Sequence, residues 1–192
     1  MKSSYAASPM IGSMKNFTKL AEGIDVSGVK AALDINYAMW DKYTIRQEFE
    51  GSPHVDTETI YIRGPEKLDR EFYQGQTAAQ PYPLPDDLAL QLNLLFFNVL
   101  TSIQPKELGY AMLVSLHPKS RVQRHRDEGR YAEHYQRFHL PIYSTKGNIF
   151  FCGDESVQMK EGELWTFNHQ LEHSVNNNSK HERIHLIFDA VL

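Results

Sequence analysis

The sequence is poor in cysteine and has no strong excess of either charge. Cys152 is the single cysteine among 192 residues. One thiol cannot form an internal disulfide or a cysteine-based zinc or iron–sulfur site. Twenty Lys and Arg against 24 Asp and Glu leave a formal net charge of −4, which gives no global field to hold nucleic acid or an anionic membrane. We therefore expect no nucleic-acid partner.

Long apolar runs and nucleotide-binding motifs are also missing. No stretch approaches the roughly 20 apolar residues of a membrane-spanning helix, and the residues that follow Lys2 do not resemble the apolar core of a signal peptide. We expect a cytoplasmic protein with no membrane partner. The sequence lacks G-x-x-x-x-G-K-[ST], G-x-G-x-x-G and G-x-S-x-G, so nothing supports a P-loop NTPase, a Rossmann enzyme or an α/β-hydrolase.

Length and composition fit one globular domain. Of the residues, 41% are hydrophobic and 23% are charged, the usual balance of a folded domain. A chain of this size buries roughly 70% of the surface that its unfolded form exposes, so it needs no metal in order to fold. Residues 1–15 show no periodicity and are expected to form a flexible N-terminal arm, while residues 16–192 are expected to form the single domain.

Two segments of the N-terminal half predict helices. Residues 25–33 have apolar side chains at helical spacing, with Asp25 or Ser27 as a candidate cap. A longer helix begins at the Pro-Asp-Asp of 85–87 and ends at Pro105. Its apolar stripe consists of Leu88, Leu92, Leu95, Phe96, Val99 and Ile103.

The remaining segments predict strands. Residues 43–49 and 58–63 are rich in β-branched and aromatic side chains, and the turn-like 51–54 separates them. From Gly109 onward short strand-like runs alternate with breaker residues: YAMLVSL, RFHLPIY, NIFF, SVQM, ELWTF and RIHLIFD. This spacing is typical of an all-β sandwich or barrel. The expected fold class is therefore mainly β with flanking helices.

Three polar residues of the β-rich half predict a metal site. His125 and Asp127 are separated by one residue, and residues i and i+2 of a strand project from the same face. His173, at the far end of the same region, is the candidate third ligand. Two histidines and one carboxylate are the facial triad of non-haem Fe(II) oxygenases, which leaves positions open for co-substrate and oxygen. A surface hydrogen bond between His125 and Asp127 is the alternative.

Arg183 begins the last strand-like run. Alternation puts two sets on opposite faces of this strand: Arg183, His185, Ile187 and Asp189 on one, and Ile184, Leu186 and Phe188 on the other. An arginine on a buried face needs an anionic partner, and a dicarboxylate such as 2-oxoglutarate can accept two parallel hydrogen bonds from a guanidinium. A salt bridge to Asp189 or Glu182, or simple exposure, is the alternative for Arg183.

An ordered set of motifs resembles the aspartyl/asparaginyl β-hydroxylase family, which also includes bacterial free-proline hydroxylases. The set is His125-x-Asp127, RFHLPI at 137–142, GELWTFNHQLEHSV at 162–175, and Arg183 in RIHLIFD. The resemblance covers residues 109–190. The animal aspartyl β-hydroxylase has glycine in place of Asp127, whereas the free-proline hydroxylases carry the carboxylate, so this site looks like the full triad.

The resemblance implies a double-stranded β-helix (jelly roll, cupin-like) that uses Fe(II), with 2-oxoglutarate and O2 as co-substrates. The implied iron ligands are His125, Asp127 and His173. Arg183 would hold the distal carboxylate of 2-oxoglutarate, and Arg137 and His139 match positions that help to hold it in relatives. The implied activity is a dioxygenase that hydroxylates an unactivated C–H of an amino acid, or of an amino-acid residue in a peptide or protein, with succinate and CO2 as co-products.

Two other functions stay open at this point. The run His169-x-x-Glu172-His173 matches the H-x-x-E-H pattern of zinc peptidases, which requires a helix there. The other alternative is a non-catalytic cupin-like binding module. No motif identifies the substrate, but four residues of the N-terminal half are candidates for a pocket mouth: Trp40, Arg46, His54 and Arg63.

Overall fold

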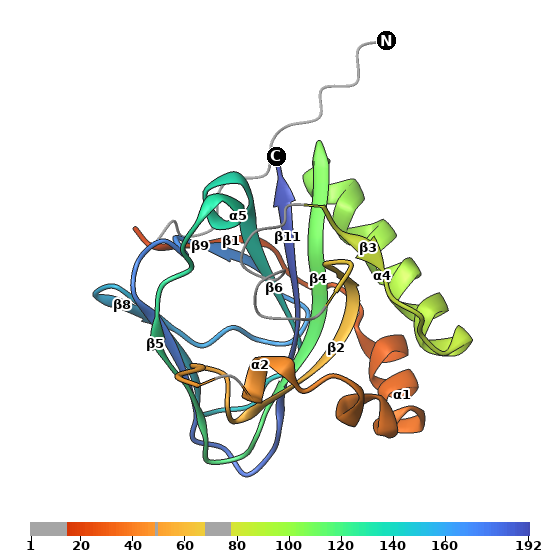
Figure 1. Cartoon of the computed structure of the whole chain (residues 1–192), viewed down its shortest axis with the longest axis horizontal. Coiled ribbons are helices and arrows are strands. Elements are labelled where there is room, and N and C mark those ends of the chain that lie inside the picture. Colours follow the sequence, from red (N-terminus) through yellow and green to blue (C-terminus); the bar gives the residue numbers. More distant parts are fainter. Residues whose placement is uncertain (1–14, 49, 68–77) are drawn as a thin grey trace.

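Two antiparallel β-sheets face each other, and helices cover the outer side of the larger one (Figure 1). The computed structural model describes residues 15–48, 50–67 and 78–192. In this part of the chain, the larger sheet has seven strands in the order β1-β9-β6-β11-β4-β2-β3, and the smaller has four in the order β5-β10-β7-β8. The arrangement confirms the predicted jelly roll with flanking helices.

The elements have the following bounds. The larger sheet contains β1 (Phe17–Ala21), β2 (Thr57–Gly64), β3 (Gln80–Pro81), β4 (Glu107–Leu116), β6 (Gln136–Tyr143), β9 (Leu164–Phe167) and β11 (Arg183–Val191). The smaller sheet contains β5 (Arg121–His125), β7 (Asn148–Cys152), β8 (Glu155–Val157) and β10 (His173–Asn177). The helices are α1 (Ser27–Ile35), the 3-10 helix η1 (Tyr37–Lys42), α2 (Ile45–Glu48), α4 (Asp86–Ile103) and α5 (Arg130–His134).

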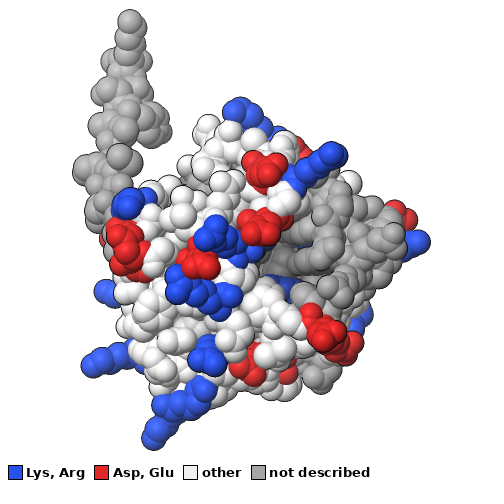
Figure 2. Space-filling view, turned by 60° about the vertical axis from the view of Figure 1, so that its left-hand side comes forward, with Lys and Arg blue, Asp and Glu red and all other residues white. Residues whose placement is uncertain are grey.

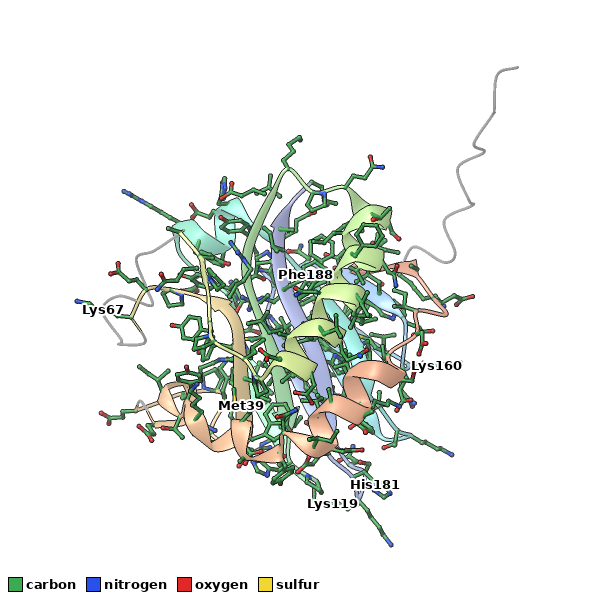
Figure 3. The ribbon with its side chains drawn as sticks, turned by 90° about the vertical axis from the view of Figure 1, so that its right-hand side faces the viewer. Met39, Lys67, Lys119, Lys160, His181 and Phe188 are labelled. Atoms are coloured by element: carbon green, nitrogen blue, oxygen red, sulfur yellow. The ribbon has the colours of Figure 1, made fainter. Side chains whose placement is uncertain are left out.

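The largest apolar core lies between α1, α4 and the outer face of the larger sheet. Phe188 of β11 stacks on Phe138 of β6 with ring centroids 5.0 Å apart. It also meets Phe96 of α4 edge to face, as its position beside α4 in Figure 3 suggests. Because α1 and α4 bury this face, the opposite face of the same strands is left to line the space between the sheets.

Both predicted helices are confirmed, but the first begins two residues later than predicted, at Ser27, and its N-cap position is Val26 rather than Asp25 or Ser27. The carboxylate of Asp25 accepts a hydrogen bond from the backbone N–H of Ser27, the first residue of α1, at 2.9 Å. In α4 the predicted stripe faces the core, with Leu88 and Val99 fully buried. The helix stops at Gln104, whose left-handed conformation (φ 48°) turns the chain before Pro105.

The predicted strand over residues 43–49 is wrong. Residues 45–48 form the short helix α2 instead, and Phe49 lies outside the described residues. The backbone N–H of Gln47 donates to the Thr44 carbonyl at 2.9 Å, and the Gln47 side chain donates to the Thr57 carbonyl. These bonds tie the segment to the start of β2 and outweigh the β propensity of its side chains.

Most of the other strand predictions hold. β2 covers the predicted 58–63, and the strand-like runs after Gly109 appear as β4, β6, β7, β8, β9 and β11. The predicted runs did not include β1, β3, β5 or β10. Of the predicted N-terminal arm only Lys15 lies within the described residues. Among the described helices, none is long and apolar enough to span a membrane.

Candidate metal centre

The smaller sheet brings the three predicted metal ligands together. His125 at the end of β5 pairs directly with His173 at the start of β10, and Asp127 follows β5 by two residues. One ligand atom from each of the three side chains lies within 4.8 Å of the other two. The Nε2 atom of His125 is 3.8 Å from Oδ1 of Asp127. This spacing fits one metal ion held by two imidazoles and a carboxylate.

Backbone carbonyls fix the orientation of both of these histidines. Nδ1 of His125 lies 2.7 Å from the Gln123 carbonyl oxygen, and Nδ1 of His173 lies 2.9 Å from that of Leu171. A carbonyl can only accept, so each Nδ1 carries the proton and donates it, and each Nε2 presents a lone pair. A protein-bound metal needs its imidazole ligands in this state.

Burial also keeps these imidazoles neutral. It lowers the pKa of His125 and lowers that of His173 to about 4, and the nearby negative charge of Asp127 offsets only part of this effect. At neutral pH neither ring has to lose a proton before it binds a cation.

The second carboxylate oxygen of Asp127 is held by neighbouring side chains. Arg137 donates from Nη1 to Oδ2 at 2.6 Å, and Nδ1 of His169 lies 3.4 Å from the same oxygen. Burial alone would raise the pKa of Asp127, but the charge of Arg137 and the contact with His169 outweigh it and leave the pKa below its ordinary value. Asp127 is therefore ionised, with Oδ2 occupied and Oδ1 turned toward His125.

Arg137 is itself bound to a second carboxylate. Its Nε and Nη2 donate to the two oxygens of Asp189 on β11, at 2.8 and 3.0 Å. The alternative considered for Arg183, a salt bridge to Asp189, is therefore not formed. The hydroxyl of Tyr131 donates to Asp189 as well, at 3.1 Å. Sequence reasoning placed Asp189 on the inner face but missed this network, because the partners lie on three separate segments.

Arg183 is buried between the sheets without a carboxylate. Its side chain is on the inner face of β11 as predicted, and the residue is 3% exposed. Nη2 donates to Nδ1 of His185 at 3.0 Å, and within the described residues no carboxylate forms a salt bridge with it. Burial lowers the pKa of Arg183 to about 9, so it is charged at neutral pH. A buried cation of this kind is a ready partner for an anionic ligand.

Two further histidines complete the inner wall. Nδ1 of His139 on β6 lies 3.3 Å from Nδ1 of His185. Because His185 Nδ1 accepts from Arg183, the shared proton belongs to His139. Burial lowers the pKa of both residues well below the ordinary value, so both rings are neutral. The ring of Phe167 packs 5.5 Å from His139 and 5.0 Å from His173, which joins this wall to the metal site.

The zinc-peptidase interpretation finds no support in this geometry. Residues 169–173 pass from a turn into β10 rather than forming a helix. His169 accompanies Asp127 instead, and the backbone N–H of Asp127 donates to the His169 carbonyl at 3.1 Å. Glu172 points elsewhere and pairs with Arg124 at 2.7 Å. The sequence match is therefore a coincidence of spacing.

Two of the four residues considered for a pocket mouth line a cavity beside Asp127. These are Arg46 and His54, and the cavity has a volume of about 520 Å³. Trp40 belongs to the outer apolar core instead. Arg63 donates to the backbone carbonyls of Gly109 and Ala79. Its guanidinium therefore binds the backbone and does not line this cavity.

The fold and the inner wall define the class of the protein. A jelly roll with two neutral histidines, an ionised aspartate and a buried arginine without a carboxylate has the architecture of 2-oxoglutarate-dependent hydroxylases. A comparison with protein families agrees: the sequence model described as "Aspartyl/Asparaginyl beta-hydroxylase" matches residues 92–191. The chain belongs to this family. A search of the curated proteins found no match.

Solved structures show the same fold. A viral collagen prolyl hydroxylase from Paramecium Bursaria Chlorella virus-1 superposes with a TM-score of 0.54 at 10% identity, over 93% of this chain and 97% of the other. A Pseudomonas putida prolyl-4-hydroxylase gives 0.50 at 13% identity, over 92% and 93%. A 2OG-Fe(II) oxygenase family protein from Burkholderia pseudomallei gives 0.53 at 13% identity over 69% of this chain, which spans 65% of that protein.

Proposed function

We propose that the protein is an Fe(II)- and 2-oxoglutarate-dependent dioxygenase that hydroxylates an unactivated C–H of an amino acid, or of an amino-acid residue in a peptide or protein. The substrate C–H becomes C–OH with one oxygen atom of O2, and 2-oxoglutarate takes up the other as it is converted to succinate and CO2. One observation carries the proposal: the three donor atoms within 4.8 Å of one another.

The donor set suits iron. His125 and His173 would supply Nε2 and Asp127 would supply Oδ1, because their other polar atoms are already bonded to the protein. Three protein ligands leave coordination positions open for co-substrate and oxygen. Cys152, the only thiol, is buried and free, and a single unpaired thiol suits a reducing compartment such as the cytoplasm.

Arg183 is the residue that we assign to the distal carboxylate of 2-oxoglutarate. Its Nε and Nη1 have no hydrogen-bond partner among the described residues, so a carboxylate would satisfy them. His139, whose Nε2 is not engaged, is assigned a supporting contact with the same molecule. Arg137 was predicted to contact the co-substrate too. With two carboxylates already on it, its first role is to orient Asp127, and the co-substrate contact stays a prediction.

Bound Fe(II) supplies the activation of O2 that no amino-acid side chain can provide. The protein's own residues hold the reactants in place and keep water out. Arg137 and His169 fix Asp127 so that a single carboxylate oxygen faces the metal. Phe150 and Phe167 pack against the His139 ring, which gives the metal site an apolar wall on that side.

The test is optical and anaerobic. We expect a weak visible absorption band when Fe(II) and 2-oxoglutarate are both present, and none with either alone. His173→Ala should lose the band, whereas His181→Ala, which removes an exposed imidazole from the turn before β11, should keep it. A band that survives in His173→Ala, or that needs no 2-oxoglutarate, would contradict the proposal. In air, the wild type should form succinate and His173→Ala should form none.

A further inference from the structure

The cavity beside the metal centre is separate from the buried position of Arg183. It is lined by α2, the start of α5, and the inner faces of β4 and β11, and it reaches Asp127 and Arg137. Figure 2 turns the left-hand side of Figure 1 forward and shows a hollow on this face, next to clustered basic and acidic side chains. A volume of about 520 Å³ accommodates a molecule of amino-acid size.

Arg46 is the unusual residue of this cavity. It lies on α2 and is 8% exposed. Its Nη1 contacts the neutral Oγ1 of Thr59 at 3.4 Å and Sδ of Met112 at 3.2 Å. Its Nε and Nη2 have no hydrogen-bond partner among the described residues. These two nitrogens form the edge of a guanidinium that binds a carboxylate through two parallel hydrogen bonds.

Among the described residues, no carboxylate is placed to neutralise Arg46. Asp127 is already bound to Arg137, and Glu128 is exposed at the mouth. In the described part of the chain, no carboxylate lies within 4.0 Å of the Arg46 guanidinium. Burying a charge without a partner is costly, so at this position the described part of the chain retains a cation that none of its carboxylates neutralises.

One part of the wall is aromatic and apolar. It consists of Tyr110, Met112, Tyr131 and Ile187. The rings of Tyr110 and Tyr131 stack with centroids 4.2 Å apart, and the Tyr131 hydroxyl accepts from the Tyr110 backbone N–H at 2.6 Å. This is a rigid surface for the carbon skeleton of a ligand whose charged end is at Arg46.

Arg46 also lies close to the metal ligands. His54 links the two, since its ring lies 5.0 Å from that of His125 and lines the same cavity as Arg46. After burial, which is the larger effect, the charge of Arg46 lowers the pKa of His54. A ligand bound to Arg46 would therefore lie next to the centre at which the proposed reaction takes place.

We propose that Arg46 recognises the prime substrate by binding a carboxylate through Nε and Nη2, and that the substrate is a carboxylic acid of amino-acid size. The inference rests on the proposed function only in treating this cavity as the prime-substrate site. It assigns a task to a residue of α2, which lies outside the segment that matches the family.

Binding is measured by calorimetry with the co-substrate site filled. The protein is loaded with Mn(II) and N-oxalylglycine, an unreactive analogue of 2-oxoglutarate, so that Arg183 is occupied. The probes are the free L-amino acids and their N-acetyl derivatives, each paired with its primary amide. For at least one pair we expect the carboxylate to bind about 10- to 100-fold more tightly than the amide, as befits hydrogen bonds to a charged group.

Three variants sharpen the test. Arg46→Met should abolish the preference for carboxylate over amide, and Arg46→Lys should keep only part of it because an ammonium cannot make two parallel bonds. Arg124→Met is the matched control, since Arg124 is exposed, pairs with Glu172 at 2.7 Å and does not line the cavity. It should change affinity less than about twofold. Thermal unfolding and Mn(II) binding establish that each variant is folded.

The outcomes separate the two proposals. If no carboxylate binds better than its amide, or if Arg46→Met keeps the preference, the assignment of Arg46 is overturned. A loss of N-oxalylglycine binding in Arg46→Met would show that Arg46 binds the co-substrate. That result would also overturn the assignment of Arg46 to the prime substrate. Failure of the proposed function looks different, because the wild type would then not bind Mn(II) and N-oxalylglycine together. The titration without them would still decide the role of Arg46.

Discussion

The two faces of β11 perform different tasks with residues that alternate along one strand. The outer face, with Leu186 and Phe188, is packed under α4 in the apolar core. The inner face carries Arg183, His185 and Asp189, all buried. Apolar burial stabilises the fold, whereas buried polar groups cost stability unless they are paired. The difference teaches that the outer face holds the sheet in place, so that the inner face can retain residues unfavourable for folding.

Removing a predicted metal ligand should have the largest effect among the changes that test the difference between the two faces. Asp127→Ala should abolish succinate formation while the free energy of unfolding of the metal-free protein changes little, because Asp189 still neutralises Arg137. Succinate is measured after incubation with Fe(II) and 2-oxoglutarate, and stability by urea unfolding. A variant that fails only because it is unfolded would mean that the inner face is structural too.

A substitution on the outer face should lower stability and leave ligand binding unchanged. Phe188→Ala removes a ring that is packed between Phe138 and Phe96, and it should lower the free energy of unfolding by about 3–5 kcal/mol. The remaining folded protein should bind 2-oxoglutarate as the wild type does. The control is Phe97→Ala on the exposed side of α4, 71% exposed, which should cost less than about 0.5 kcal/mol. Equal losses in the two variants would remove the distinction between core and surface.

The sequence was informative where a local period decides the structure. Alternation placed Arg183 on the inner face of β11, and helical spacing placed the stripe of α4, because burial on one side imposes a fixed repeat. The predicted metal ligands came from the spacing of His125 and Asp127 and from a resemblance whose motifs lie in this half, although Asp127 lies two residues beyond β5. His125 and Asp127 are near in sequence, and only His173 had to be matched across the chain.

Contacts between distant segments could not be predicted in this way. Tertiary hydrogen bonds make α2 a helix where side-chain propensity favours a strand. This helix places Arg46 on the cavity wall. The pairing of Arg137 with Asp189 was missed because it depends on the register of β6 and β11, where the two residues lie directly opposite each other. Which arginines lack a carboxylate is therefore a property of the fold, and no single segment encodes it.

Arg183 offers a direct test of the cost of the inner face. Arg183→Met should weaken 2-oxoglutarate binding by about 2–5 kcal/mol, roughly 30- to several-thousand-fold, because it removes the partner of a buried carboxylate. Without ligand, the same variant should be as stable as the wild type or more so, since a buried charge is replaced by an apolar side chain. Calorimetry and urea unfolding measure the two quantities. Lower stability without a change in affinity would assign Arg183 to the structure alone.

The smallest effect concerns the neutral histidines of the inner face. Burial, followed by the charge of Arg183, lowers the pKa of His185 well below 6.5. The unfolded chain therefore binds more protons than the folded one once the pH drops below 6.5, and the free energy of unfolding must fall with pH.

The slope of the free energy of unfolding against pH is measured between about pH 7.5 and 5.5. This range lies above the pH at which the titration of carboxylates dominates the slope. His185→Leu should reduce the slope by up to about 1.4 kcal/mol per pH unit, the full value for one proton. His181→Ala, which removes an exposed imidazole outside the inner face, is the control and should leave the slope unchanged. If His185→Leu and the wild type share one slope, His185 accepts its proton without unfolding, and the inner face at β11 is less costly to the fold than its burial indicates.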